Sequence, residues 1–322
     1  MGNKSALVTG GAGFIGSHVA DRLLAAGYDV TIVDNLSSGR RENLPASARF
    51  IEADITSPDA AHVVRDGAFD VLCHLAAQID VRRSMDDPAY DARINILGTL
   101  NLLEAIRTAS PRTRVVFSST GGALYGDFDP PPSGELTGKD PEAPYGIAKL
   151  AVEYYLAYYG RVHGIDTVAL RYGNVYGPRQ DPHGEAGVVA IFCNRLLDER
   201  ALMIYGDGTQ TRDYVYAGDV AAANVLAAGA MLPPAARLDA RAFNIGTGIE
   251  TTVNALAASL QRAAASTTPI EYAPPRAGEL LRSALNTRKA NEVLGWSPSV
   301  SIDEGLAETF AWFAARRAGV SA

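Results

Sequence analysis

The segment Gly10–Gly16 constrains the fold of this chain more than any other part of its sequence. It reads Gly-Gly-Ala-Gly-Phe-Ile-Gly and directly follows the apolar run Ala6-Leu7-Val8. A helical pattern then extends from Ile15 to Ala26. Glycines at positions 10, 13 and 16 permit a tight turn, close approach of backbone to a ligand, and close packing of helix on strand. The pattern predicts a strand–turn–helix unit whose helix N-terminus attracts an anion.

The acid that ends the next apolar run indicates which anion this turn binds. Val30–Val33 is followed by Asp34, 18 residues after Gly16, near the ~20 residues at which an acid binds ribose in dinucleotide-binding units. Asp34 can accept both adenosine ribose hydroxyls and repels a 2′-phosphate, so NAD is favoured over NADP. Arg40 and Arg41 lie nearby and keep NADP open as an alternative.

Short apolar runs alternate with amphipathic helical patterns along the first half of the chain. This alternation is typical of βαβ units, so we predict a Rossmann-like, doubly wound parallel α/β sheet with helices on both faces. Further strands are expected at 49–51, 71–75, 114–118, 167–170 and 243–245, and helices at 95–110 and 145–163.

Regularity fades after about Asn174. Loops are expected at 127–144, 177–187, 206–213 and 232–241. We therefore predict a nucleotide-binding domain at 1–173 plus about 214–250. A smaller C-terminal substrate domain is expected at about 174–213 and 251–322.

The composition excludes several classes of protein. The 322-residue chain has 29 Lys and Arg against 36 Asp and Glu, a net charge of −7, so it lacks the basic footprint of a nucleic-acid binder. No apolar stretch approaches the ~18 residues of a membrane span. No Cys/His cluster predicts a metal site. Cys73 and Cys193 lie in apolar runs, which predicts buried thiols and a cytoplasmic protein.

Tyr145 and Lys149 form the candidate catalytic pair. At positions i and i+4 of a helix, the phenol and the ammonium lie on the same face. The nearby cation favours the phenolate, which makes the tyrosine an acid/base group usable near neutral pH. The pair follows the strand end Ser118-Ser119-Thr120, where a hydroxyl can hold the reacting oxygen of a substrate against the tyrosine.

These motifs resemble the extended short-chain dehydrogenases/reductases of the NAD-dependent epimerase/dehydratase family, and among them the UDP-glucose 4-epimerases. The resemblance covers nearly the whole chain. Its more specific stretches are His74–Gln78, Ser118–Gly126, Arg171–Val189, Gly206–Tyr214 and Phe243–Gly248.

The resemblance implies a catalytic triad of Tyr145, Lys149 and Thr120. Ser119 is the alternative hydroxyl, because one extra glycine stands at Gly121-Gly122. The residues implied to bind NAD are Gly10, Gly13, Phe14, Ile15, Gly16, Asp34, Asn35, Ser38, Gly39, Asp54, Ile55, Leu75, Ala76, Ala77, Asn95, Ser118, Tyr145, Lys149, Tyr172 and Val175.

The resemblance also implies a set of substrate-binding residues. Arg212 and Arg276 would hold the diphosphate, Tyr205 would line the uracil, and Glu279 would lie near the uridine ribose. The small residue Ser283 would leave room for a C2 N-acetyl group; its alternative role is to begin a strand at 284–286. The remaining residues of this set are Gln78, Thr120, Tyr145, Asn174, Gly187 and Val188.

The implied reaction inverts C4 of a UDP-hexose through a 4-keto intermediate. UDP-glucose and UDP-galactose are the expected substrates, with their N-acetylated counterparts as further candidates. The alternatives are a 4-epimerase specific for N-acetylglucosamine or a uronate, a nucleotide-sugar 4,6-dehydratase or decarboxylase, and a non-catalytic NAD-binding sensor. Relatives pair two helices per subunit, here about 88–110 and 145–163, so the resemblance implies a homodimer.

Overall fold

A seven-stranded parallel sheet forms the centre of the computed structural model, which describes residues 4–126, 130–182, 187–275 and 280–319. The strand order is β11-β6-β5-β4-β1-β2-β3, and all neighbours run parallel. The order reverses between β1 and β4, which is where doubly wound sheets bind ligands. The strands are β1 Ser5–Thr9, β2 Asp29–Asp34, β3 Arg49–Glu52, β4 Val71–His74, β5 Arg114–Thr120, β6 Thr167–Tyr172 and β11 Ala242–Ile245.

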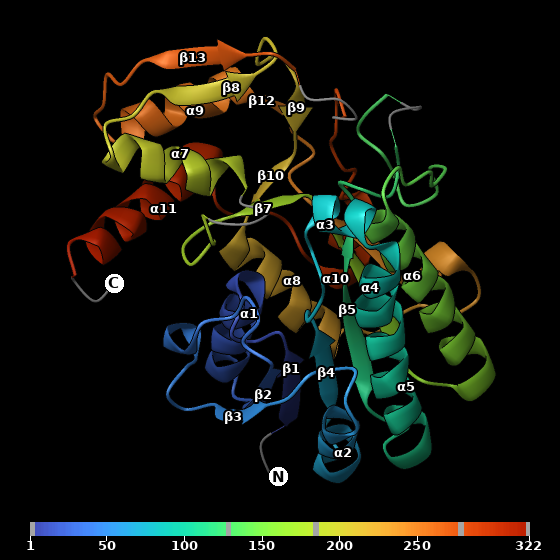
Figure 1. Cartoon of the computed structure of the whole chain (residues 1–322). Coiled ribbons are helices and arrows are strands. Elements are labelled where there is room, and N and C mark those ends of the chain that lie inside the picture. The colour runs from blue at the N-terminus through green and yellow to red at the C-terminus, as the bar shows by residue number, and fades with distance from the viewer. Residues whose placement is uncertain (1–3, 127–129, 183–186, 276–279, 320–322) are drawn as a thin grey trace.

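Helices cover both faces of this sheet, so the predicted doubly wound α/β fold is confirmed (Figure 1). One face carries α1 (Phe14–Ala25), α8 (Ala217–Gly229) and α10 (Arg288–Leu294). The other carries α2 (Pro58–Gly67), α5 (Gly98–Ala109) and α6 (Pro144–His163).

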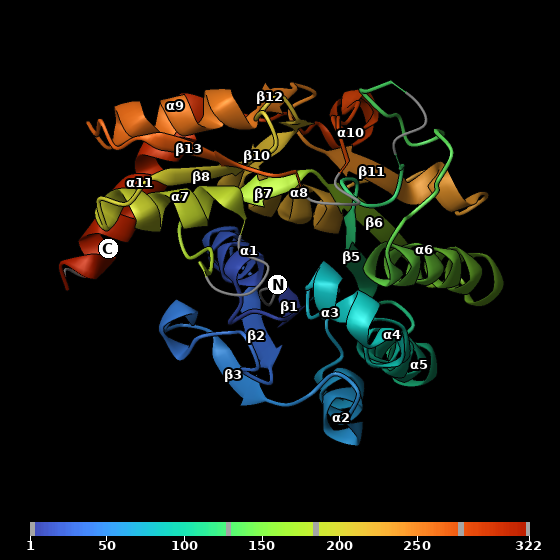
Figure 2. The same cartoon turned by 45° about the horizontal axis from the view of Figure 1, so that its top comes forward.

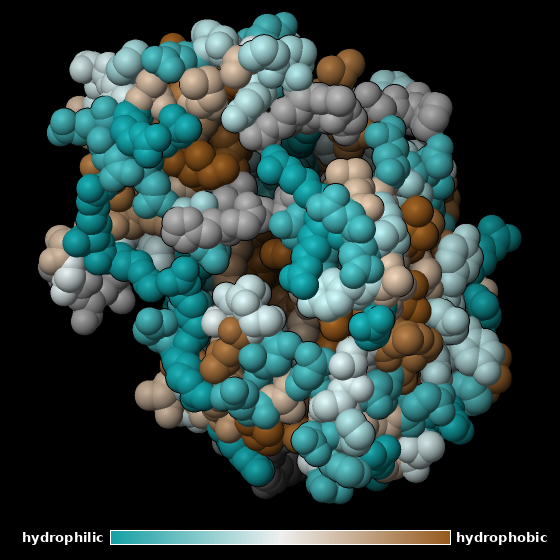
Figure 3. Space-filling view, viewed as in Figure 1, coloured by the Kyte–Doolittle hydropathy of each residue, from teal (hydrophilic) through white to brown (hydrophobic). Residues whose placement is uncertain are grey.

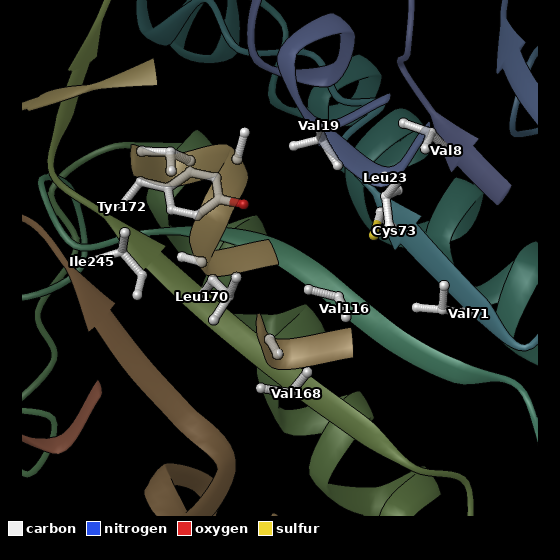
Figure 4. Packing of buried hydrophobic residues seen from close by; sticks show 14 of the residues in the cluster. Val8, Val19, Leu23, Val71, Cys73, Val116, Val168, Leu170, Tyr172 and Ile245 are labelled. Atoms are coloured by element: carbon white, nitrogen blue, oxygen red, sulfur yellow. The ribbon is translucent and has the colours of Figure 1, made fainter. Parts of the chain in front are cut away.

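Side chains alternate between two hydrophobic clusters along each central strand, as the period of two of a β-strand requires. On β5, Val116 belongs to the cluster under α1 and α8, whereas Val115 and Phe117 belong to the cluster under α5 and α6. Figure 4 shows the first cluster, to which Val8, Cys73 and Leu170 contribute from three different strands. Burial on both faces explains why these strands read as continuous apolar runs.

A smaller lobe with its own hydrophobic cluster lies beside the carboxyl ends of the central strands (Figure 2). It contains α7 (Val188–Leu197), α9 (Val253–Ala263) and α11 (Ile302–Arg317), with β8 (Leu202–Tyr205) paired to β13 (Ile270–Ala273). Two further strand pairs link it to the main sheet. They are β7 (Asn174–Tyr176) with β10 (Tyr214–Tyr216), and β9 (Thr211–Arg212) with β12 (Thr251–Thr252).

Several predicted bounds differ from the structure. The strand expected at 71–75 ends at His74, while β5 and β6 continue two residues further than expected, to Thr120 and Tyr172. The loop expected at 206–213 contains β9, and that at 232–241 ends in the 3-10 helix Leu238–Arg241. The strand expected at 284–286 is a single bridge between Ser133 and Leu285. The added residues of β5 and β6 pair with each other, and Leu285 bridges to Ser133, so these ends depend on remote partners that local hydrophobic pattern does not reveal.

The helix expected at 95–110 is part of a longer helical run with a local distortion. The run begins with α3 (Val81–Asp86) and α4 (Pro88–Ala92), passes through the π-helical turn Arg93–Leu97 and continues as α5. Pro88 at the start of α4 has no amide hydrogen to lose, so it is tolerated there. The π-helical turn contains Asn95, whose side chain contacts the backbone of Gln78 just after β4.

Candidate active site

A cavity of about 610 Å³ opens at the carboxyl ends of β1, β4 and β5, between the main sheet and the smaller lobe. Figure 3 shows the molecular surface hollowed at this place. Most predicted cofactor residues line the cavity: Gly10, Gly13, Phe14, Ile15, Gly16, Asp34, Asn35, Ser38, Asp54, Ile55, Leu75, Ala76, Ala77, Ser118, Tyr145, Lys149, Tyr172 and Val175. The reversal of strand order between β1 and β4 thus coincides with a large cavity.

The glycine turn is packed so closely that side chains cannot be added to it. Gly10 has φ +73°, and a Cβ there would lie 2.6 Å from the backbone nitrogen of Ala76. A Cβ on Gly16 would collide with the carbonyl oxygen of Gly10. These contacts bring the bare start of α1 to the cavity wall, where its backbone amides can contact a diphosphate.

Asp34 lies at the end of β2 with its carboxylate directed by the turn. It is 8% exposed and accepts hydrogen bonds from the Ala12 amide at 3.0 Å and the Leu36 amide at 2.8 Å. Burial raises the pKa of Asp34, and the two amide donors act in the opposite direction. Gly39 is not among the cavity-lining residues; it lies behind Asp34, where a Cβ would come within 2.8 Å of Oδ1.

The two arginines that kept NADP open both have acidic neighbours. Arg41 pairs with Glu52 at the end of β3, and Arg40 Nη2 lies 3.4 Å from Asp181 Oδ1. Each guanidinium is therefore partly neutralised by a carboxylate of this chain. The negative charge of Asp34 would also repel the 2′-phosphate of NADP. The geometry therefore favours NAD.

Tyr145 and Lys149 lie together at the start of α6, which Pro144 begins and Gly164, with φ +69°, ends. The Tyr145 amide donates to Ser84 Oγ at 3.2 Å. Lys149 is 3% exposed; its Nζ donates to the Ser118 carbonyl at 2.8 Å and lies 5.8 Å from the centroid of the Tyr145 ring. Burial lowers the pKa of Lys149 to about 8, against the opposing charges of Asp91 and Glu153.

The choice between Ser119 and Thr120 follows from strand alternation. Ser119 is 3% exposed and its hydroxyl donates to Glu153 Oε1 at 2.5 Å, inside the core under α6. Both residues border the cavity, where Thr120 is half-buried, but the Ser119 hydroxyl is already engaged by Glu153. Because neighbouring side chains of a strand point to opposite faces, the geometry favours Thr120 as the hydroxyl that meets substrate.

The sequence analysis placed Asn95 among the NAD-binding residues, but Asn95 is not among the residues that line the cavity. It is 3% exposed, and its side-chain amide pairs with both backbone groups of Gln78, each at 2.9 Å. Gln78 itself lines the cavity. Asn95 therefore acts on the cavity through Gln78, because the π-helical turn directs it toward the backbone that follows β4.

The predicted substrate residues divide into three groups. Gln78, Thr120, Tyr145, Asn174, Gly187 and Val188 line the cavity. Tyr205, Arg212 and Ser283 are described but are not among its lining residues; they lie on β8, on β9 and just before the Leu285 bridge. Arg276 and Glu279 lie outside the described residues.

Arg179 is a cavity residue that sequence reasoning missed. It has φ +68°, and its Nη2 pairs with Asp21 Oδ2 on α1 at 2.6 Å. Its other terminal nitrogen, Nη1, is buried without a hydrogen-bond partner among the described residues. Its place after Gly177-Pro178, a typical turn dipeptide, was the available signal. The long-range contact with α1 was not visible in the sequence.

The part of the chain that the structure describes contains neither a candidate metal site nor a candidate membrane-spanning helix. No group of three His, Cys, Asp or Glu side chains is placed to hold a metal ion. In the same ranges, no helix is both long enough and apolar enough to cross a membrane.

Comparison with known proteins identifies close relatives of this chain. The family model described as "NAD dependent epimerase/dehydratase family" matches residues 6–246. A UDP-glucose 4-epimerase of Mycolicibacterium smegmatis is 46% identical over 312 residues, which cover 95% of this chain and 97% of that protein.

Solved structures share the whole fold. The UDP-glucose 4-epimerase of Thermotoga maritima, solved with UDP-glucose, has a TM-score of 0.91 at 46% identity and covers 97% of this chain and 99% of its own. The enzyme of that name from Thermus thermophilus, solved with NAD, has a TM-score of 0.88 at 42% identity, covering 96% and 99%. A UDP-N-acetylglucosamine 4-epimerase from Methanobrevibacter ruminantium has a TM-score of 0.90 at 33% identity, covering 98% and 100%.

Proposed function

We propose that this chain, which belongs to the NAD dependent epimerase/dehydratase family, interconverts UDP-glucose and UDP-galactose by inverting C4 of the hexose. One observation carries the proposal: Tyr145, Lys149 and Thr120 line the same cavity as the glycine turn and Asp34. A single ligand-sized space thus joins a nucleotide-binding end to an acid/base end. The M. smegmatis and T. maritima relatives are both named for this reaction.

The residues present fit NAD. Gly10 and Gly16 leave bare backbone where added Cβ atoms would clash, and Asp34 presents a carboxylate at the end of β2. These groups would hold the diphosphate and the adenosine ribose, and Lys149 would contact the nicotinamide ribose. When bound, NAD supplies a reversible two-electron acceptor for the C4 position of the sugar.

Three side chains carry the proposed proton chemistry. Tyr145, as phenolate, takes the proton of the C4 hydroxyl and later returns it to the same oxygen, after C4 has presented its opposite face for reduction. The ammonium of Lys149, held at the Ser118 carbonyl, favours the phenolate electrostatically. Thr120 holds the reacting oxygen. Between the two proton transfers the 4-keto hexose turns about its diphosphate, so the hexose must be held more loosely than the nucleotide.

We propose epimerisation rather than elimination because the chain lacks carboxylates next to Thr120. Gly121 and Gly122 follow it, and a Cβ on Gly121 would lie 2.6 Å from a methyl carbon of Leu285. Elimination of water needs an added acid and base at C5 and C6, and the two glycines offer no side chain for either role.

The function is tested with purified protein, UDP-galactose and no added NAD, with product identified by NMR. Formation of UDP-glucose supports the proposal. A parallel reaction with UDP-N-acetylgalactosamine tests the further proposal that Ser283 admits a C2 N-acetyl group. Conversion of UDP-galactose alone refutes that role of Ser283. Failure with UDP-galactose, even after NAD is added, contradicts the proposed function itself.

Replacing Asp34 by asparagine will weaken NAD binding by about 10–100-fold, because a hydrogen bond to a charged group contributes about 1.5–3 kcal/mol. Discrimination against NADP will also fall, since the repelling charge is gone. Calorimetric titration of protein freed of cofactor measures the dissociation constants of NAD and of NADP. Asp29→Asn, on the exposed first residue of the same strand, is the control. Unchanged NAD affinity in Asp34→Asn would show that Asp34 does not bind the ribose.

We also propose that the chain forms a homodimer through α6 and the helical run that ends in α5. Figure 3 shows apolar side chains gathered over these helices. Large apolar residues on this face are strongly exposed: Leu97 58%, Ile147 53%, Tyr154 58%, Tyr158 43% and Val162 60%. Ile147, Tyr154, Tyr158 and Val162 recur at helical spacing along α6, and exposed apolar residues gathered on one face are typical of an interface.

We also propose that the protein acts in the reducing cytoplasm, a proposal supported by its two free, buried cysteines, Cys73 and Cys193.

The double substitution Tyr154→Glu/Tyr158→Glu will convert a dimer of 34.0 kDa chains into monomers, because four like charges would be buried at a two-fold interface. Light scattering coupled to size exclusion measures the mass. Tyr272→Glu, a 59% exposed tyrosine on β13, is the control and will leave the mass unchanged. A monomeric parent protein would contradict the proposed interface.

A further inference from the structure

Asp91 is a buried carboxylate that the proposed chemistry does not yet use. It lies on α4 and is 1% exposed. Its Oδ1 accepts hydrogen bonds from Gln78 Nε2 at 2.9 Å and from Asn95 Nδ2 at 3.0 Å. Its Oδ2 is buried without a hydrogen-bond partner among the described residues. A buried ionised oxygen without a hydrogen bond is costly unless an opposite charge compensates it.

The carboxyl of Asp91 is ionised in this arrangement. Oδ1 receives two N–H donors, and no acceptor in the described ranges meets Oδ2, so a proton on either oxygen would have no partner. Burial raises the pKa of Asp91, whereas its two donors and the positive charge of Lys149 lower it. Asp91 and Lys149 form no direct ion pair among the described residues, so the charge of Lys149 acts on this carboxylate at longer range, across the packed helices α4 and α6.

Lys149 is surrounded by groups from four elements. The charges of Asp91 on α4 and Glu153 on α6 raise its pKa, and its own charge lowers the pKa of His74 on β4. Its Nζ lies 5.8 Å from the centroid of the Tyr145 ring on α6 and 4.7 Å from that of the Phe117 ring on β5. The Glu153 carboxylate is already shared among Ser119 and the guanidinium of Arg171. Asp91 has no such competing cation among the ion pairs of the described residues.

His74 is neutral and contributes no charge near neutral pH. Thr99 Oγ1 donates to the Asn95 carbonyl at 2.6 Å, so it accepts from His74 Nε2 at 2.9 Å, and His74 Nδ1 accepts from Thr9 Oγ1 at 2.6 Å. Burial lowers the pKa of His74 to about 3. His74 therefore contributes nothing to the titration of this cluster between about pH 6 and pH 9, the range in which Lys149 titrates.

We propose that Asp91 is a positioning residue with two effects: it is the buried counter-ion that keeps Lys149 charged, and it fixes the cavity-lining Gln78 from behind. Both effects act through other residues. The hydrogen bonds hold the backbone after β4, and the charge supports the ammonium on which the Tyr145 phenolate depends. The inference rests on the proposed function for its effect on turnover, but its electrostatic part is measurable without substrate.

The substitution Asp91→Asn separates charge from hydrogen bonding. The asparagine oxygen can accept from Gln78 and Asn95 as Oδ1 does, and its amide takes the place of the unpartnered Oδ2. Asp86→Asn is the matched control, because Asp86 is an exposed acid five residues earlier on α3. If Asp91→Asn fails to fold, Asp91→Ser removes the same charge with a smaller side chain.

The first readout is titration of Lys149 by NMR of protein labelled with [13C]lysine. The chain has four lysines, Lys4, Lys139, Lys149 and Lys289, so the Lys149 signal is assigned by its loss in Lys149→Arg. We expect Lys149 to titrate near pH 8 in the parent protein and in Asp86→Asn. In Asp91→Asn its midpoint will fall by about one pH unit, the size of effect expected from one nearby opposite charge. An unchanged midpoint overturns the counter-ion role.

The second readout is the pH dependence of kcat with UDP-galactose. Activity needs protonated Lys149, so it is lost as pH rises through the lysine's pKa, and lowering that pKa moves the loss to lower pH. Asp91→Asn will be near parental at pH 6 and about fivefold slower at pH 8, as a one-unit shift predicts. An equal loss at every pH overturns the charge effect. If no protein turns over while the NMR midpoint shifts, the proposed function fails and the electrostatic role of Asp91 stands.

Discussion

Replacement of Tyr145 by phenylalanine will lower kcat for UDP-galactose about 10²–10⁴-fold, the range contributed by a positioned acid/base group. The substitution removes one oxygen and leaves the ring at the start of α6. The ring lies beside Lys149, whose ammonium is fixed by the Ser118 carbonyl. KM will change little, because nucleotide contacts dominate ground-state binding. Initial rates across substrate concentrations, followed by NMR or anion exchange, measure both constants.

Tyr155→Phe is the control for this prediction. Tyr155 lies on the same helix, is 40% exposed and is not among the residues of the proposed interface, so loss of its hydroxyl will leave kcat within about twofold of the parent, as is usual for a surface change away from the chemistry. Cofactor content, read from absorbance after denaturation, must be equal in the compared proteins. Retention of full activity by Tyr145→Phe would remove Tyr145 from the mechanism.

Replacement of Arg171 by methionine will lower the free energy of unfolding by about 3–5 kcal/mol, because it leaves buried carboxylates without their cation. Arg171 lies on β6 with 0% exposure and binds Glu153 of α6 through Nε at 3.0 Å and Asp239 through Nη2 at 2.7 Å. Its Nη1 donates to Tyr125 Oη at 3.0 Å. Urea unfolding followed by fluorescence of the fully buried Trp296 measures the change.

A surface ion pair provides the contrast. Arg262 and Asp303 are 3.0 Å apart, but their side chains are 64% and 66% exposed, so Arg262→Met will cost less than about 1 kcal/mol. The double variant Arg171→Met/Glu153→Leu will regain part of the lost stability, since it removes the buried anion as well. Equal costs for Arg171→Met and Arg262→Met would show that burial does not amplify the Arg171 interactions.

The Arg171 cluster also joins stability to the catalytic residues. Glu153 lies one helical turn after Lys149, and it accepts the hydroxyl hydrogen of Ser119, the neighbour of Thr120. The same carboxylate therefore holds the end of β5 against α6. Loss of Arg171 would loosen this carboxylate and so displace Thr120 relative to Tyr145. We therefore expect the Arg171→Met protein that remains folded to have a lower kcat for UDP-galactose.

Much of the fold was predictable because its determinants are local. Burial on both faces makes the central strands apolar runs, and helix capping by Pro144 and Gly164 limits α6 to about the predicted span. The π-helical turn was not predictable, because the sequence of Arg93–Leu97 fits an ordinary helix and its distortion serves the distant backbone of Gln78. The same holds for the missing strand at 284–286, where Leu285 makes one bridge to the remote Ser133.

The sequence by itself determined the doubly wound sheet, the glycine turn with Asp34, and the Tyr145–Lys149 pair. Each depends on spacings within one strand–turn–helix unit or one helical turn, which backbone geometry converts directly into position. Only the tertiary structure placed Ser119 against Glu153, turned Asn95 toward the backbone of Gln78, brought Arg179 to the cavity and buried Asp91 beside Gln78 and Asn95. Those outcomes depend on contacts between segments tens to more than a hundred residues apart, such as Ser119 with Glu153 and Arg179 with Asp21. Such contacts exist only once the chain has folded.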